Sequence, residues 1–351
     1  MATRIAGAAI ALIAIVGCSW AVGMTEPDRT AQLAPFRRAD AIPFPETNPY
    51  SRAKAELGRS LFFDPVLSRD GTRTCGTCHL PSNDWTDDRP RAPRNDGAAM
   101  ATRTPTLLDV AWSERSLGWD GQFRDLESVA FGPITAAANM NMTEALLIER
   151  LSAVPSYVSA FRAAFPEAAD EARPITRLRI EQALATFQRL IVAGPAPFDR
   201  WVSGETGAVS AAARRGFDLF TGRAHCEACH SGPSFTDGSF HDIGTAQGEE
   251  IGRGRFFPTS TALRHAFKTP TLRNVARRPP YMHDGSVTTL AAVIDLYDRG
   301  GIDRPSRSRD IRPLNLTPGE KADLIAFLES LTDAGADGPA YQPLPDHPPT
   351  P

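Results

Sequence analysis

The sequence has few lysines, few cysteines and no large excess of either charge. Only three of its 38 lysine and arginine residues are lysines, namely Lys54, Lys268 and Lys321, and the arginines are spread along the chain without clustering. We interpret the arginine excess as a bias in residue usage. Because the formal net charge is −3, nucleic acid is not an expected partner. Disorder is not expected either, because 42% of the residues are hydrophobic and only 23% are charged.

Long apolar runs are absent after residue 23. Before it, the stretch Ile5–Gly23 is apolar or small and follows Arg4, a pattern typical of an export signal. Three interpretations are open: cleavage after Ala21 or Gly23, lipidation of Cys18 in a lipobox-like context, and an uncleaved anchor, which needs about 20 apolar residues. Each carries the rest of the chain across a membrane, so we predict a periplasmic protein, with or without an N-terminal membrane tether.

Alternating strand patterns are scarce, and helical periodicity dominates. At about 100–200 residues per domain, the 351 residues suggest two domains. We divide the chain into a signal or tether (1–23), an extended leader (24–50), two domains (51–203 and 204–335) and a proline-rich tail (336–351). The amphipathic pattern predicts helices over Ala53–Phe63, Thr143–Phe165, Ile175–Val192, Ala211–Phe220, Leu290–Tyr297 and Thr317–Leu331.

Four of the five cysteines form two tight pairs, each followed directly by a histidine. This C-x-x-C-H spacing attaches c-type haem, because the two thiols add to the vinyl groups and the histidine is carried under the iron. A disulfide would leave both histidines unexplained, and a zinc site would require two distant pairs to converge. We therefore predict one covalent c-type haem per domain, held by Cys75, Cys78 and His79 and by Cys226, Cys229 and His230.

From about Ala53 to Leu331, the two motifs and the sequence around them resemble the bacterial di-haem cytochrome c peroxidase and MauG family. The resemblance implies a mainly α fold with two cytochrome c-like helical domains and one haem in each. The motifs that carry it are Leu61–Asp64, Cys75–Pro81, Trp119–Gly121, Gly132–Ile134, Phe198–Trp201, Phe267–Asn274 and Pro280–Gly285.

The ligand of the C-terminal haem distinguishes two branches of this family. Fourteen residues after the histidine of the H-D-G motif, the peroxidases have a methionine and MauG-like members have a tyrosine; here His283 leads to Tyr297. The resemblance thus implies that His230 and Tyr297 bind this iron. A thioether favours ferrous iron, whereas a phenolate stabilises ferric and higher states. Two alternatives remain open. Tyr297 is a buried core residue on a helix, or Met282 is the ligand of this iron.

The resemblance also assigns roles near the N-terminal haem. Trp119 lies between the haems as an electron relay, with a packed core indole as the alternative, and Pro133 lies over the open haem face. The distal glutamine and glutamate of the family fall on Val129 and Asn139. An amide cannot shuttle protons, so either another carboxylate serves or the chemistry is slower or different. The nearest carboxylates in sequence are Asp125, Glu127 and Glu144.

The family further implies a calcium ion between the domains, held in part by an asparagine side chain. Arg103 stands at that position, which argues against calcium; the expected carbonyl donors would be those of Arg278 and Pro280.

The resemblance implies a periplasmic oxidoreductase that uses hydrogen peroxide to oxidise a tryptophan or tyrosine on a partner protein through a high-valent di-haem state. One alternative is a cytochrome c peroxidase that takes electrons from a small cytochrome. Another is a non-enzymatic di-haem electron carrier, which the replacements at Val129 and Asn139 favour.

Overall fold

The computed structural model describes residues 26–113, 115–335 and 344, and it is mainly helical, as predicted. Within these residues the strands are limited to β1 (Phe240–His241) and β2 (Phe267–Lys268), which pair antiparallel. No helix in the described part of the chain is both long and apolar enough to cross a membrane. The predicted signal or tether lies outside the described residues, and so does the proline-rich tail apart from Leu344.

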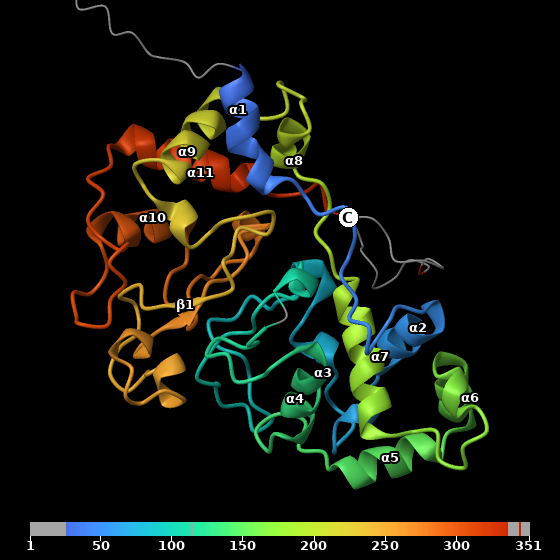
Figure 1. The fold of residues 1–351 in the computed structure, drawn as a ribbon. Coiled ribbons are helices and arrows are strands. Elements are labelled where there is room, and N and C mark those ends of the chain that lie inside the picture. The colour runs from blue at the N-terminus through green and yellow to red at the C-terminus, as the bar shows by residue number, and fades with distance from the viewer. Residues whose placement is uncertain (1–25, 114, 336–343, 345–351) are drawn as a thin grey trace, which may run out of the picture.

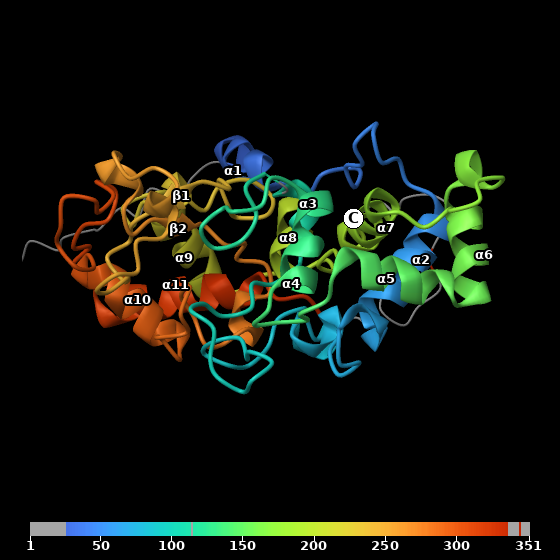
Figure 2. The same ribbon diagram turned by 90° about the horizontal axis from the view of Figure 1, so that it is seen from below.

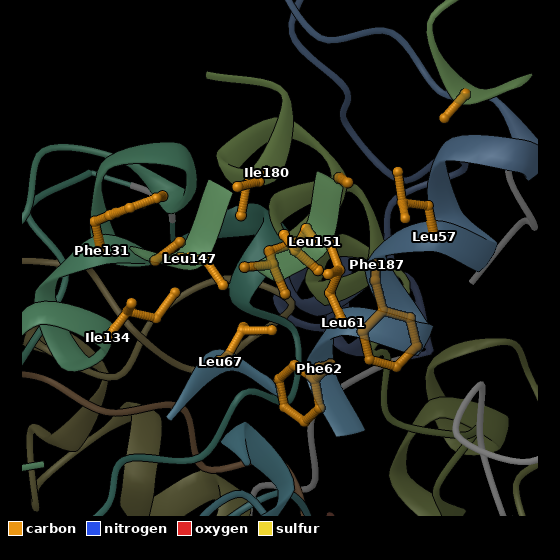
Figure 3. Packing of buried hydrophobic residues seen from close by; sticks show 14 of the residues in the cluster. Leu57, Leu61, Phe62, Leu67, Phe131, Ile134, Leu147, Leu151, Ile180 and Phe187 are labelled. Atoms are coloured by element: carbon orange, nitrogen blue, oxygen red, sulfur yellow. The ribbon is translucent and has the colours of Figure 1, made fainter. Parts of the chain in front are cut away.

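The described chain forms two lobes, which Figures 1 and 2 show side by side. In the first lobe, α2 and α7 pack face to face. They approach so closely at Gly58 that a Cβ there would lie 1.9 Å from the Ala183 carbonyl oxygen, so only glycine fits. Figure 3 shows the buried leucine, isoleucine and phenylalanine side chains around this contact. The helices of this lobe are α2 (Arg52–Phe63), α3 (Leu126–Val129), α4 (Phe131–Thr135), α5 (Glu144–Ser152), α6 (Pro155–Ala164) and α7 (Arg177–Arg189).

The second lobe also contains two helices that pack closely at a glycine. Its helices α9 and α11 meet at Gly216, where a Cβ would lie 1.9 Å from the Asp323 carbonyl oxygen. Around them a cluster of phenylalanine rings is almost fully buried, including Phe198, Phe217 and Phe327. The helices of this lobe are α8 (Pro197–Val202), α9 (Ala211–Thr221), α10 (Leu290–Arg299) and α11 (Pro318–Ser330). In each lobe the helix that carries the glycine, α2 or α9, precedes a C-x-x-C-H motif.

The predicted helix over Thr143–Phe165 is wrong as a single element, because the structure breaks it into α5 and α6. The break falls at Pro155, the first residue of α6. Proline lacks the N–H that a continuous helix needs and its ring clashes with the preceding turn, although it is well suited to a helix start.

The prediction of an extended leader over residues 24–50 is wrong in part. This segment contains α1 (Glu26–Leu33) and a 3-10 turn, Ala34–Phe36. Phe36 is fully buried and its ring stacks on Phe235 at a centroid distance of 5.1 Å. Figure 1 shows α1 against the second lobe, far in sequence from its neighbours. Burial of an aromatic side chain fixes this segment. Helix α8, which precedes the predicted boundary at residue 204, also packs its side chains into the second lobe.

Candidate active site

The two C-x-x-C-H motifs form short 3-10 turns, Cys75–Thr77 and Cys226–Ala228, one in each lobe. Cys75 packs against the core of the first lobe and Cys226 against that of the second. Because the two pairs belong to different lobes, they do not converge on one zinc site. The two thiols and the histidine of each motif fit the attachment of one c-type haem in each lobe.

Both histidines of these motifs are arranged as neutral ligands. The Nδ1 atom of His79 lies 3.1 Å from the Trp85 carbonyl oxygen, and that of His230 lies 2.9 Å from the Phe235 carbonyl oxygen. Because a carbonyl can only accept, Nδ1 carries the proton and Nε2 keeps its lone pair for a metal. Burial lowers the pKa of both rings, which further favours the uncharged form that binds iron.

A cavity of about 850 Å³ extends from the first motif to the interface between the lobes. Its volume is within the range of cofactor sites. From the first lobe it is lined by Cys75, Cys78 and His79, and from the second by Phe267–Leu272 and Tyr281–His283. A haem attached at the first motif would therefore enter this cavity and approach the second lobe.

The residues expected on the open side of the N-terminal haem do line this cavity: Val129, Pro133 and Asn139. The Asn139 Oδ1 accepts a hydrogen bond of 3.3 Å from the Arg73 guanidinium. The amide is thus fixed as an acceptor toward Arg73, which leaves its NH₂ group as the hydrogen-bond donor available to a ligand.

None of the three carboxylates considered from the sequence lines the cavity. The Asp125 side chain caps α3, and Glu144 forms an exposed ion pair with Arg177. Glu127 is bound by the fully buried Arg189 at 2.8 Å. Their closeness in sequence was misleading, because the Asp125 carboxylate binds the start of α3 and those of Glu127 and Glu144 bind arginines of α7.

The carboxylates that line the cavity are instead those of Asp120, Glu249 and Glu250. Asp120 belongs to the tryptophan-containing motif and could have been found from it. Glu249 and Glu250 lie in the other lobe, in a stretch without a motif, so sequence spacing gives no signal for them. Glu250 is paired with Arg91 at 3.2 Å and Asp120 with Arg255 at 2.9 Å.

Trp119 also lines the cavity, and it is hydrogen-bonded to both halves of the chain. Its indole Nε1 donates to the Arg103 carbonyl oxygen at 2.9 Å, while its own carbonyl accepts from the Lys268 amide at 2.8 Å. The indole therefore lies at the interface of the lobes, as an electron relay would require, and is not part of either buried core.

Tyr297 and Met282 lie at different places. Tyr297 is on α10, close to Cys226 and Cys229, and burial raises the pKa of its hydroxyl. Met282 lines the large cavity beside the first motif. Since a raised pKa keeps the phenol protonated, ionisation at neutral pH requires a nearby cation such as ferric iron.

The residues at the expected calcium position do not fit a metal ion. The guanidinium of Arg103 is buried there and donates to the Arg278 carbonyl oxygen at 3.2 Å and to the Asp87 carbonyl oxygen at 3.3 Å. A fixed cation thus occupies one of the carbonyls expected to bind calcium, and a second cation at this place would be repelled.

These donor sets, one in each lobe with an indole between them, are those of a two-haem redox protein. The family model for di-haem cytochrome c peroxidase matches residues 52–207. The methylamine utilization protein MauG of Methylorubrum extorquens is 48% identical over 91% of this chain and 90% of that protein. The cytochrome-c peroxidase IdrP1 of Pseudomonas sp. (strain SCT) is 33% identical over 95% of this chain and 96% of that protein.

Among solved structures, a MauG-like protein associated with microbial copper homeostasis matches with a TM-score of 0.79 and 31% identity, covering 87% of this chain and 96% of that one. The chain belongs to the di-haem cytochrome c peroxidase and MauG family and is a haem-dependent oxidoreductase of the peroxidase type. The predicted architecture of two cytochrome c-like domains is confirmed.

Proposed function

We propose that this protein uses hydrogen peroxide to oxidise a tryptophan or tyrosine residue of a partner protein, with both haems taking part. The observation that carries the proposal is the position of Tyr297, close to Cys226 and Cys229 in the second lobe. In this account His230 and Tyr297 would hold the iron of the C-terminal haem. His79 would hold the iron of the N-terminal haem, and the four cysteines of the motifs would bond to the vinyl groups.

The identity of the residue at position 297 distinguishes oxidation of a partner protein from reduction of peroxide with electrons from a small cytochrome. When bound, the haems supply the iron centres that accept the two oxidising equivalents of peroxide. An anionic phenolate lowers the potential of its iron relative to a thioether, so a His and Tyr pair stabilises oxidised states and is a poor acceptor for electrons from a small cytochrome. This ligand set suits storage of oxidising equivalents.

The chain's own residues shape the open face of the N-terminal site. Pro133 lines this face of the cavity and its ring has no group that could ligate a metal, so a haem held by His79 would meet no protein donor from this residue. Asn139, held by Arg73, can orient a bound oxygen atom by hydrogen bonding but cannot accept its proton. A proton released in the cavity would have to reach one of the lining carboxylates, of which Asp120 adjoins the relay residue Trp119.

A residue of a partner protein is oxidised at a distance, because a folded protein cannot enter a cavity of about 850 Å³. Trp119, bonded to both lobes, is the residue through which electrons pass between the two sites. We also propose that the protein acts in the periplasm, on the strength of the export-type sequence Ile5–Gly23.

Electron paramagnetic resonance of the purified ferric protein tests this assignment. We expect one high-spin signal from a five-coordinate N-terminal haem and one low-spin signal from the His230 and Tyr297 site. A spectrum without the high-spin signal would contradict the proposal. A cytochrome c peroxidase would instead show a high-potential C-terminal haem and rapid turnover of peroxide with reduced cytochrome c.

A further inference from the structure

Two arginine side chains are buried in the wall of the large cavity without a carboxylate partner. Arg103 and Arg278 are each 7% exposed, and both line the cavity. The ion pairs found among the described residues include neither of them, although their neighbours Arg273 and Arg277 are both paired with aspartates.

The hydrogen bonds of the two guanidinium groups go to neutral oxygen atoms. Arg103 donates to the carbonyl oxygens of Arg278 and Asp87 and to the Thr86 hydroxyl, at 3.2, 3.3 and 3.5 Å. Arg278 donates to the carbonyl oxygens of Thr271 and Arg273, at 2.9 and 2.6 Å. In both residues the Nε–H group is buried and has no partner among the described residues.

Such an arrangement is costly unless an anion completes it. Burial lowers the pKa of Arg278 to about 10, and the positive charge of Arg103 adds to the effect, against an opposing contribution from Asp84. Burial likewise lowers the pKa of Arg103. A buried charge is stable only when it is paired and hydrogen-bonded. The nearby carboxylates of Asp87 and Asp84 offset part of these charges, but neither guanidinium forms an ion pair among the described residues and each has a buried Nε–H group without a partner. Two such cations facing one cavity therefore indicate an anionic ligand there.

We propose that Arg103 and Arg278 form a dicationic site that stands in place of a divalent metal ion between the lobes and binds the carboxylates of the haem in this cavity. Haem carries two propionate groups, which match the two guanidinium charges, and each free Nε–H can donate to one carboxylate. This inference concerns the binding of the cofactor and does not depend on which substrate the enzyme oxidises.

Arg103 is also placed to connect the lobes in the way that a shared metal ion would. Its backbone N–H donates to the His283 carbonyl oxygen at 2.9 Å, its carbonyl accepts from Trp119, and its guanidinium reaches Arg278. One first-lobe residue thus contacts two second-lobe residues and the relay. The lobes are held here by covalently attached cations, so calcium is not needed for the structure of this interface.

The test uses the holoprotein with both haems attached, verified by haem content per chain. The calcium content of the wild type is measured by elemental analysis before and after chelation, together with the optical spectrum. The midpoint potential of the high-spin haem is then measured for Arg103→Asn, Arg103→Lys and Arg278→Gln. Arg94→Gln is the matched control, because Arg94 is an exposed first-lobe arginine whose ion pair is with Asp96.

We expect no stoichiometric calcium in the wild type and no spectral change on chelation. Arg103→Asn and Arg278→Gln should lower the potential of the high-spin haem, because removal of a nearby positive charge disfavours the ferrous state. Arg103→Lys, which keeps the charge, should stay closer to the wild type, and the control should equal it. Because Arg278→Gln removes the other charge, it gives the same test if Arg103→Asn does not fold.

Added calcium should bind to Arg103→Asn, whose amide oxygen and the released Arg278 carbonyl offer oxygen donors, and should restore part of the lost potential. One calcium ion per wild-type chain, with a spectral change on its removal, would overturn the proposal. Wild-type potentials in both charge-removing variants would overturn it as well.

Discussion

The indole N–H of Trp119 donates a hydrogen bond of 2.9 Å to the backbone carbonyl of Arg103, a residue whose own N–H is bonded to His283 in the opposite lobe. The relay residue is thus fixed by the same segment that joins the lobes. Because electron transfer depends steeply on distance, an indole held from both sides keeps the path between the two sites constant. A change at the interface between the lobes would therefore also move the Trp119 indole.

Replacement of Trp119 should separate the two haems electronically while leaving each one intact. We predict that Trp119→Phe keeps the ferric spectra of both sites but slows the transfer of oxidising equivalents between them at least about tenfold, equal to about 1.4 kcal/mol in the barrier. Rapid-mixing spectroscopy after one equivalent of peroxide measures this rate. Trp112→Phe is the control, because Trp112 does not line the cavity; equal rates in the two variants would show that Trp119 is not the relay.

Tyr297 should determine the properties of the C-terminal haem. Tyr297→Met replaces a phenolate by a thioether, so the midpoint potential of that haem should rise and the oxidised state formed with peroxide should decay faster. Redox titration and stopped-flow spectroscopy give both quantities. Tyr157→Phe is a suitable control, since Tyr157 is bonded to Asp64 in the first lobe. An unchanged low-spin spectrum in Tyr297→Met would mean that another residue is the ligand.

Asn139 should limit the rate of peroxide cleavage. A carboxylate in its place could move a proton, and general acid–base groups contribute about 10²–10⁴-fold. We predict a smaller gain for Asn139→Glu, about tenfold, because Arg73 lies 3.3 Å from this side chain and would hold the carboxylate ionised. Stopped-flow measurement of the bimolecular rate constant tests this. Asn139→Gln should show no gain, and a gain in both variants would point to cavity shape as the cause.

Glu127 should affect stability and not the reaction with peroxide. It is bound by Arg189, which is fully buried; removing one partner of a buried pair costs about 3 kcal/mol. Burial by itself raises the pKa of Glu127, but hydrogen bonds and charge from Arg189 outweigh it, so the net shift is downward. The pair therefore stabilises the fold above the carboxyl's unfolded pKa of about 4.3, and this contribution is lost as pH falls through the lower folded value.

Thermal unfolding of wild type and Glu127→Gln between pH 3 and 7 checks this account. The difference in stability should be constant at neutral pH and shrink in acid, while the peroxide rate constant stays at the wild-type value. A large fall in that rate constant would return Glu127 to the set of catalytic candidates.

Features encoded by a short stretch of sequence could be predicted, whereas features that depend on packing between distant segments could not. Helix α11 begins where expected, since Thr317 caps it and bonds to Glu320 three residues on. The haem-attachment turns are local motifs of the same kind. Phe36 is buried by contacts with residues far along the chain, which its proline-rich surroundings do not reveal.

In the candidate site, too, some lining residues could be predicted from the sequence and others could not. Val129, Pro133 and Asn139 line the cavity, as the resemblance to the family implied. The lining carboxylates Glu249 and Glu250 come from the other lobe, so no distance along the sequence relates them to the first motif. The resemblance places Arg103 where the family has an asparagine, but the contact of Arg103 with the Arg278 carbonyl arises only when the two lobes meet.

The central claim is that the two haem sites share the oxidising equivalents of one peroxide, and it is tested most directly by adding one equivalent of hydrogen peroxide to the ferric protein. Electron paramagnetic resonance then follows the high-spin and low-spin signals separately. The account predicts that both signals disappear together, persist in the altered state for longer than the mixing time, and return together. Loss of the high-spin signal alone, with the low-spin signal of the His230 and Tyr297 site unchanged, would contradict it.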